Sequence, residues 1–147
     1  MQEDPPSRED CIQFMHAWRH FFHSMKRGML RDIEQELNID ASDMPLLQAL
    51  QQGCQYPSEV SQSYGMAPPM VSQMIVRTVK QGLVGRELDP EDSRRIRLNL
   101  TDQGKSVVDH AHRYLEARFL NSGLTAAELK HLTQGLIKLG EALKEEA

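Results

Sequence analysis

Basic side chains gather in one segment of a chain that is acidic overall. Between residues 67 and 105, seven Lys and Arg stand against five Asp and Glu, a local charge of +2, whereas the 147 residues together carry −4. The basic residues of this segment are Arg77, Lys80, Arg86, Arg94, Arg95, Arg97 and Lys105. Because phosphate binding responds to local rather than total charge, this segment is a candidate surface for an anionic partner such as duplex DNA.

Part of this charge lies on a predicted helix from Pro68 to Gln81. On a helical wheel one side of this helix is mainly apolar and predicts the buried face, with Val71, Met74, Ile75 and Thr78 on it. The exposed residues, which are the candidates for contact with DNA, are Pro69, Met70, Ser72, Gln73, Arg77 and Lys80. Gln73 can form two hydrogen bonds to an adenine, and Arg77 can reach a guanine or a phosphate. The alternative for a helix considered alone is a polar face that contacts only water.

Short elements on both sides of this face complete a pattern. A helix-turn-helix is predicted over residues 57–81, with its turn at Tyr64-Gly65-Met66. The helical period is then lost, and strands are predicted over 83–88 and 95–100; in the second strand polar and apolar residues alternate. Residues 89–94 form a polar, charged loop between the strands. A helix-turn-helix followed at once by a two-stranded wing is a DNA-reading unit.

Longer helices flank this unit. An apolar series at three- and four-residue steps from Ile12 predicts a first helix of about 25 residues, opened by Ser7 as N-cap with Asp10 as its partner. Thr101 is the predicted N-cap of a fifth helix, and a capping box beginning at Thr125 opens a sixth. The first helix is longer than a small core needs, which favours packing against a second copy of the chain.

The second helix and the domain boundaries follow from the same signals. For the second helix, Ser42 is favoured over Asp40 as N-cap because Pro45 then falls in the first turn. The predicted fold is mainly α with a small two-stranded β-wing. It is divided into a flexible N-terminal tail (1–10), dimerisation helices (11–37 and 106–147) and a winged helix-turn-helix domain (38–105).

The sequence also excludes several classes of protein. Its longest run of apolar residues is three, Met74 to Val76, far short of the ~20 that a membrane span requires, so no membrane protein is expected. The first ten residues resemble neither a secretory signal nor a transit peptide, which predicts a cytoplasmic location. Cys11 and Cys54 form no CxxC motif, and the motifs GxSxG, HExxH, GxGxxG and Walker A are absent. We therefore expect neither an enzyme nor a cofactor.

The loop and the strand after it resemble the wing signature of the MarR (multiple antibiotic resistance regulator) family. Asp89-Pro90-Glu91-Asp92-Ser93-Arg94, followed by Leu98 to Gly104, is similar to D-P-x-D-R-R, alternating apolar residues and L-T-x-x-G. The order of helices agrees over nearly the whole chain. The resemblance implies a homodimeric repressor or activator on a pseudo-palindromic operator, with Arg94 entering the minor groove and Asp92 orienting it or pairing with a neighbouring arginine. The candidate DNA contacts of the wing are Arg86, Asp92, Arg94 and Arg95.

The sequence departs from the family pattern at several positions. Ser93 stands where the family usually has the first arginine of the pair, and Arg95, offset by one residue, is expected to project to the other face of the strand. Gln73 occupies a position often held by arginine. Pro68 and Pro69 remove two N–H donors that can otherwise bind a phosphate at the start of a helix. We expect a lower affinity or an atypical operator.

Members of this family commonly respond to small phenolic ligands, thiol oxidation or metals, and the first helix offers a candidate for each. Trp18, Phe22 and His20 can line a site for a small aromatic effector, although such a stripe also suits a core or a dimer interface. Cys11 is the candidate redox thiol, and the alternative for it is a buried small apolar residue. Three histidines share a helix face but lack an obvious paired carboxylate, so no metal site is assigned: His16, His20 and His23.

Two other functions fit the same pattern. The chain can be a dimeric helical interaction module of the same fold without operator binding, or a redox- or metal-responsive variant of the regulator. If the chain binds DNA, its affinity for duplex DNA should depend steeply on salt concentration. If it is the interaction module, it should retain no duplex even at low salt.

Overall fold

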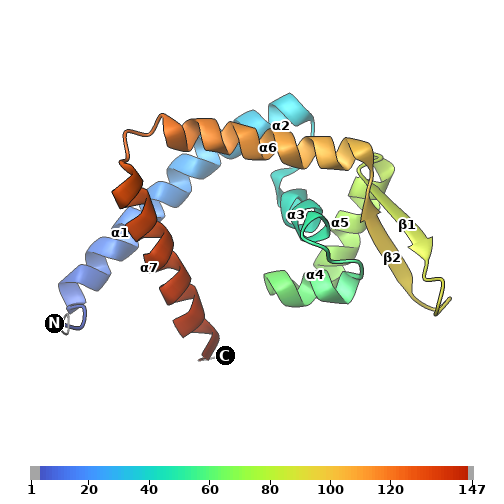
Figure 1. Ribbon diagram of the computed structural model, residues 1–147, viewed down its shortest axis with the longest axis horizontal. Coiled ribbons are helices and arrows are strands. Elements are labelled where there is room, and N and C mark those ends of the chain that lie inside the picture. The colour runs from blue at the N-terminus through green and yellow to red at the C-terminus, as the bar shows by residue number, and fades with distance from the viewer. Residues whose placement is uncertain (1–3, 146–147) are drawn as a thin grey trace. The chain divides into compact units, whose positions relative to one another are not determined.

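The computed structural model describes residues 4–145, except for the side chains of Met29 and Glu145. The chain divides into two compact units, one up to Ala111 and the other from His112 onward, and helix α6 (Asp102–Leu120) contributes to both. The elements follow the predicted order (Figure 1): the described part is mainly helical and contains one two-stranded antiparallel sheet.

The first helix begins at Arg8, directly after the predicted N-cap Ser7 and within the segment assigned to the N-terminal tail. The reason is the predicted capping box: the Ser7 Oγ accepts a hydrogen bond from the Asp10 N–H at 3.2 Å, and the Asp10 Oδ2 accepts one from the Ser7 N–H at 2.8 Å. The helix continues through α1 (Arg8–Ser24), a π-helical turn η1 (Met25–Leu30) and α2 (Arg31–Leu37). It ends where Asn38 adopts a left-handed conformation with a φ of 51°.

The second predicted helix is α3 (Met44–Gln51), and Ser42 is not its N-cap. Ser42 lies inside a 3₁₀ turn, η2 (Ala41–Asp43), which precedes α3. The Oδ1 of Asp40 accepts a hydrogen bond from the Ser42 N–H at 2.8 Å and so caps this short turn. Pro45 lies in the first turn of α3, as predicted.

The helix-turn-helix and the hairpin have the predicted order. They comprise α4 (Pro57–Tyr64), α5 (Pro68–Lys80), β1 (Val84–Leu88) and β2 (Ile96–Leu100). Gly65, with a φ of +60°, ends α4 and turns the chain toward α5. In the antiparallel hairpin Val84 pairs with Leu100, and Leu88 pairs with Ile96. The core of the first unit is made of aliphatic side chains from these elements, α3 and α6: Leu46, Leu47, Val60, Val71, Met74, Leu83, Leu98 and Val108.

A close approach between α6 and the hairpin fixes the base of the wing. A Cβ built at Gly104 lies 2.1 Å from the Leu83 carbonyl oxygen, so only glycine fits without a backbone shift. The Thr101 Oγ1 donates to the Gly82 carbonyl at 2.6 Å and accepts from the Gly104 N–H at 3.1 Å. The threonine and glycine of the wing signature therefore hold the start of α6 against the hairpin.

We expect Gly104→Ala to lower the free energy of unfolding by about 2–3 kcal/mol, because the added methyl group meets backbone atoms that cannot rotate away. Urea unfolding measures the change. Gly135→Ala is the matched control, since a Cβ at this helical glycine of α7 has nothing within 4 Å, and it should be neutral or slightly stabilising. Equal unfolding midpoints for both variants would contradict this account of the close approach.

The second unit consists of the part of α6 from His112 and of α7 (Ala126–Glu145). Thr125 and Glu128 form the predicted capping box: the Glu128 Oε2 accepts from the Thr125 N–H at 2.8 Å, and the Thr125 Oγ1 accepts from the Glu128 N–H at 3.3 Å. The leucines of α7 are exposed in the single chain, and none of the residues of α1 is buried. Among residues 4–145 no helix combines the length and the apolar character needed to cross a membrane.

Candidate nucleic-acid interface

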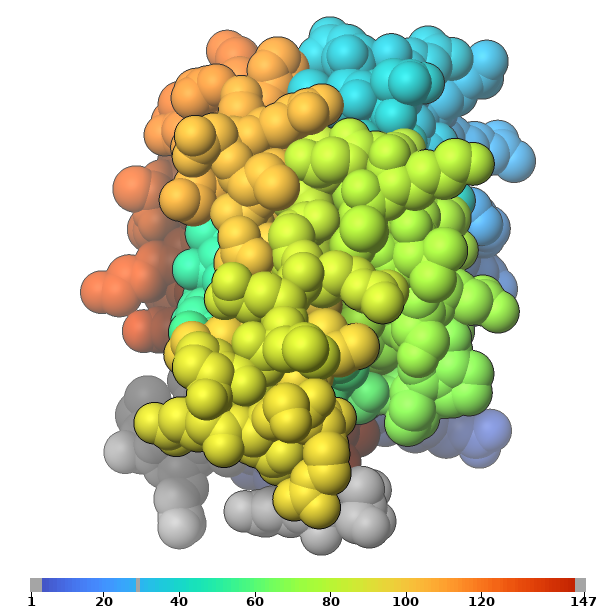
Figure 2. Space-filling view, turned by 90° about the vertical axis from the view of Figure 1, so that its right-hand side faces the viewer, coloured from blue at the N-terminus to red at the C-terminus, as the bar shows by residue number. Residues whose placement is uncertain are grey.

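Helix α5 presents the exposed face that the sequence predicts. The residues predicted to be buried are buried: Val71, Met74, Ile75 and Thr78. Thr78 fits among apolar neighbours because its hydroxyl donates to the Met74 carbonyl at 2.8 Å. The exposed residues include five of the six candidate contacts, Pro69, Met70, Ser72, Gln73 and Lys80. Figure 2 shows α5 in green beside the hairpin in yellow, on one face of the molecule.

Arg77, the sixth candidate on α5, forms an ion pair with the buried carboxylate of Asp43. Its Nη2 lies 2.6 Å from the Asp43 Oδ1, and its Nε donates to both oxygens at 3.1 and 3.2 Å. The Asp43 side chain is 1% exposed and that of Arg77 is 42% exposed. The hydrogen bonds to Asp43 raise the pKa of Arg77. This pair holds α5 against η2, so Arg77 has a structural role besides its predicted contact with DNA.

The wing loop is attached to the start of α4 through Tyr56. The Tyr56 hydroxyl donates a hydrogen bond to the Asp89 Oδ2, which lies 33 residues further along the chain. The Oδ1 of Asp89 accepts from the backbone N–H groups of Glu91 at 2.8 Å and Asp92 at 3.3 Å. These bonds lower the pKa of Asp89, the one from Tyr56 most, and the same bond raises the pKa of Tyr56. Asp89 is therefore an ionised acceptor at neutral pH.

Arg94 lies at the tip of the wing and is oriented by Asp92. The Asp92 Oδ1 accepts hydrogen bonds from the Arg94 N–H and Nε, each at 3.1 Å. The Arg94 side chain is 89% exposed. An exposed pair of this kind contributes little to stability, so its effect is to restrict the pose of a guanidinium that faces solvent. Of the two roles that the resemblance implied for Asp92, these hydrogen bonds support the orientation of Arg94.

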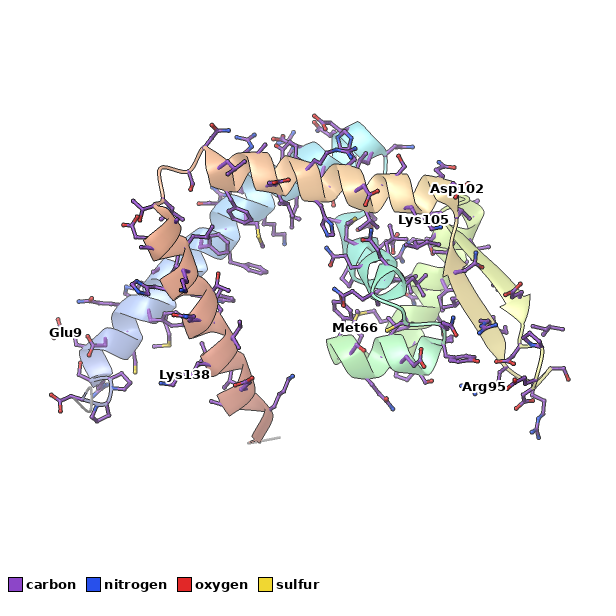
Figure 3. The ribbon with its side chains drawn as sticks, in the orientation of Figure 1. Glu9, Met66, Arg95, Asp102, Lys105 and Lys138 are labelled. Atoms are coloured by element: carbon purple, nitrogen blue, oxygen red, sulfur yellow. The ribbon has the colours of Figure 1, made fainter. Side chains whose placement is uncertain are left out.

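The other wing arginines have different surroundings. The Arg95 guanidinium lies over the Tyr56 ring, 3.8 Å from its centroid, near the far end of the hairpin (Figure 3). The Arg97 Nη2 and Nε donate to the Gln55 Oε1 at 3.0 and 3.3 Å. Arg86, on β1, is exposed. The four candidate contacts of the wing thus lie on one hairpin, and Arg95 also packs on Tyr56, the N-cap residue of α4.

Two residues of this arrangement had no signal in the sequence. Tyr56 and Gln55 lie between α3 and α4, in a segment with no motif or charge, yet both contact the wing. The Gln55 carbonyl also accepts a hydrogen bond from the Leu98 N–H of β2 at 2.7 Å. The dipeptide Tyr56-Pro57 predicts only an extended residue before a helix, not the partner of its side chain.

The candidate sensing residues of α1 are all exposed: Cys11, Trp18, His20 and Phe22. Trp18 stacks on Phe14, with ring centroids 6.3 Å apart, and lies 6.4 Å from Phe21. In the single chain Cys11 is therefore exposed, whereas the alternative interpretation expects a buried small apolar residue. Among the residues described, no group of three or more His, Cys, Asp or Glu side chains is placed to hold a metal ion.

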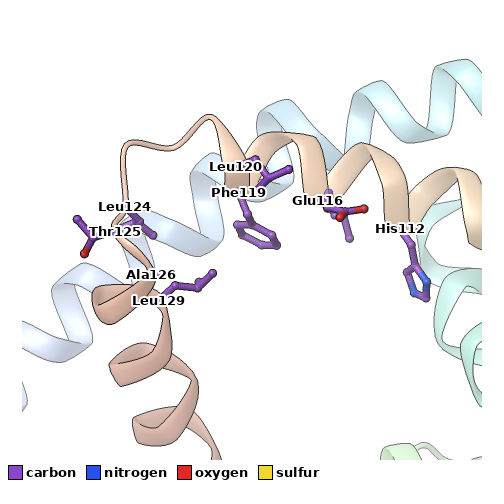
Figure 4. Close-up of a pocket in the computed structure, with 9 residues that line it drawn as sticks. His112, Glu116, Phe119, Leu120, Leu124, Thr125, Ala126 and Leu129 are labelled. Atoms are coloured by element: carbon purple, nitrogen blue, oxygen red, sulfur yellow. The ribbon is translucent and has the colours of Figure 1, made fainter.

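An apolar hollow of about 570 Å³ lies in the second unit, between the end of α6 and the start of α7 (Figure 4). Its walls include Leu115, Phe119, Leu120, Leu124 and Leu129. None of the candidate effector residues lines it. Three leucines of its walls are themselves exposed in the single chain: Leu120, Leu124 and Leu129.

Several solved structures with a similar fold are transcription regulators. A MarR family transcription regulator matches with a TM-score of 0.76 at 18% identity over 95% of each chain. A MarR regulator from Methanosarcina mazei gives a TM-score of 0.76 at 18% identity over 92% of this chain and 99% of its own. A mutant MarR from E. coli in complex with operator DNA gives 0.70 at 22% identity over 91% and 99%. No family model and no curated protein matches the sequence. The chain has the winged-helix fold of MarR-family regulators.

Proposed function

We propose that this chain is a transcription regulator of the MarR family that binds double-stranded DNA as a homodimer. The observation that carries the proposal is a single face on which the exposed side of α5 lies beside a wing whose tip arginine is held toward solvent by Asp92. The shared fold with a regulator complexed with operator DNA supports it. Selection of bound duplexes from a random pool tests it, and recovery of no duplex would exclude it.

In this proposal the two parts of the face have different tasks. Helix α5 enters the major groove, where Gln73 reads a base through its amide and Lys80 contacts the backbone. The wing lies against the neighbouring minor groove, where the narrow and negative walls of an A·T tract attract Arg94. Arg86 and Arg95 add positive charge along the same hairpin. The prolines at the start of α5 provide no N–H there, so phosphate contacts depend on side chains.

Gln73→Ala should change which base is preferred at one position of each half-site. The expected loss is about 1–3 kcal/mol of binding free energy on the selected duplex and little on a random duplex, because only a base-specific contact is removed. Titration of both duplexes measures it. Gln13→Ala, an exposed glutamine on α1, is the control. A loss of equal size on both duplexes contradicts the assignment of Gln73 to base reading.

The homodimer is supported by apolar side chains that the single chain leaves exposed. On α7 a stripe at three- and four-residue steps is between 40% and 61% exposed: Leu129, Leu132, Leu136, Leu139 and Leu143. On α1 Phe14, Trp18 and Phe21 are each 47–48% exposed. Apolar patches of this extent mark interfaces between proteins. A dimer with two-fold symmetry places two α5 helices on half-sites roughly 10 bp apart in a pseudo-palindromic operator.

We propose further that the protein acts in the cytoplasm as a repressor, without enzymatic activity, and that a small aromatic effector alters its binding to DNA. Trp18, Phe22 and His20 are the candidate effector contacts, and oxidation of the exposed Cys11 is the alternative signal. Calorimetry against a panel of phenols, and DNA binding before and after peroxide treatment, separate the two. If no phenol gives a heat of binding and peroxide leaves DNA binding unchanged, both hypotheses are contradicted.

The interaction module without operator binding is distinguished by salt. If the protein neutralises phosphates, the logarithm of the binding constant falls linearly with the logarithm of salt concentration, with a slope of about −0.9 per phosphate. A module that has lost DNA binding retains no duplex at low salt.

A further inference from the structure

Tyr56 is held in place by its neighbours along the chain. Pro57 restricts it to an extended conformation, and its φ and ψ are −122° and 147°. Its N–H donates to the Glu59 Oε2 at 3.2 Å, and the N–H of Gln55 donates to the same oxygen at 2.7 Å. The phenol therefore projects from a fixed point at the start of α4, the first helix of the helix-turn-helix.

From this point hydrogen bonds lead to the tip of the wing. The phenol donates to Asp89, which is 8% exposed. Asp89 in turn accepts from the N–H of Asp92, and the carboxylate of Asp92 accepts from the N–H and guanidinium of Arg94. Backbone hydrogen bonds with Arg95 close the base of the loop, from the Asp89 N–H to the Arg95 carbonyl at 3.0 Å and from the Arg95 N–H to the Asp92 carbonyl at 2.9 Å. The phenol adds a link to the loop from a different element, the start of α4. The Arg95 guanidinium covers the phenol ring on one side.

We propose that Tyr56 is the positioning residue for the wing arginine, holding Asp89 so that the loop presents Arg94 in one pose. The inference rests on the proposed function, since it gives Tyr56 a part in DNA binding without a contact to DNA. A loop that is already ordered loses less conformational entropy on binding than one that must be ordered by the duplex. Removing the hydroxyl therefore weakens binding through Arg94.

Tyr56→Phe removes one oxygen and keeps the ring beneath Arg95. We expect it to weaken binding to the selected duplex about 3- to 10-fold, whereas Arg94→Ala weakens it by about tenfold or more. In the double variant the Tyr56 substitution should have no further effect, because the arginine it positions is gone. Tyr64→Phe, which removes a hydroxyl from the other end of α4, is the matched control and should bind as wild type.

A purely structural role gives a different result. If Tyr56→Phe weakens binding equally with and without Arg94, the two effects multiply and the proposal is overturned. The proposal is also overturned if the Tyr56→Phe variant binds the selected duplex as tightly as the wild-type protein does. Backbone amide resonances report the loop directly: those of Glu91, Asp92 and Arg94 should shift in Tyr56→Phe and stay unchanged in Tyr64→Phe. Unshifted amides in Tyr56→Phe refute the proposed link.

A second variant covers the case in which Tyr56→Phe is too unstable to measure. Asp89→Asn keeps one acceptor oxygen but cannot accept from the phenol and both N–H groups as a carboxylate does. It should show the same fold-loss as Tyr56→Phe and the same lack of additivity with Arg94→Ala. The experiment distinguishes failure of this inference from failure of the proposed function. If the wild-type protein binds no duplex, both proposals fail. If the wild-type protein binds and these variants bind equally well, only the role of Tyr56 fails.

Discussion

Leu136→Asp in α7 should convert the protein into a monomer that no longer binds its operator. Leu136 lies in the middle of the exposed leucine stripe of α7 and is itself 48% exposed. Burial of a leucine contributes about 1.5–3 kcal/mol, and an aspartate in its place adds the cost of removing a charge from water. A two-fold interface contains the substitution twice, so we expect the dimer dissociation constant to rise by at least about a thousandfold. Sedimentation equilibrium measures it.

The control for this prediction lies on the same helix. Gln134→Asp introduces the same charge on the opposite side of α7, away from the stripe, and should leave the dimer intact. Circular dichroism establishes that each variant is still helical. Leu132→Asp tests a second position of the stripe, at 52% exposed, and should behave like Leu136→Asp. A folded monomeric variant that binds operator as tightly as wild type would refute the dimer model.

Arg77→Ala should destabilise the first unit by about 2–3 kcal/mol, even though Arg77 lies on the helix proposed to read DNA. Removing the guanidinium leaves the carboxylate of Asp43, 1% exposed, without its partner. Loss of one member of a fully buried pair costs about 3–5 kcal/mol, and we expect a smaller cost here because the Arg77 side chain is 42% exposed and partly screened by water. Urea unfolding gives the free energy.

A double variant separates this effect from any contact with DNA. In Arg77→Ala with Asp43→Ala no unpaired carboxylate remains, so the double variant should be more stable than Arg77→Ala alone. Affinity measured under conditions in which each variant is fully folded then shows whether Arg77 also reads a base. A double variant less stable than either single one would contradict the ion-pair account.

Much of this fold was predictable because its signals are local. The buried and exposed sides of α5, the alternation in β2 and the capping boxes at Ser7 and Thr125 depend on residues within one or two turns of each other. The prediction of Ser42 as N-cap of the second helix was wrong because a 3₁₀ turn, capped by Asp40, precedes α3. Period and cap residues do not distinguish a short 3₁₀ turn from the first turn of an α-helix.

The contacts that set the candidate site were not predictable in the same way. Tyr56 and Asp89 are 33 residues apart, and Arg77 and Asp43 are 34 apart. Neither pair leaves a spacing or a periodicity in the sequence, since each partner belongs to a different element. The resemblance to the wing signature implied that Asp92 orients Arg94 or pairs with a neighbouring arginine, and these residues lie within one short loop of the chain. What the sequence did not contain was the attachment of that wing to α4.

The π-helical turn η1 gives the long N-terminal helix a position at which its length can vary. A π-helix bonds each residue to the fifth one along instead of the fourth, so the turn between Met25 and Leu30 accommodates a surplus residue. Deleting one residue there, such as Gly28, lets the turn relax to α-helical bonding without rotating α1 against α2. A variant that lacks Gly28 should therefore retain the angular relation between Trp18 and Ile33 along this helix.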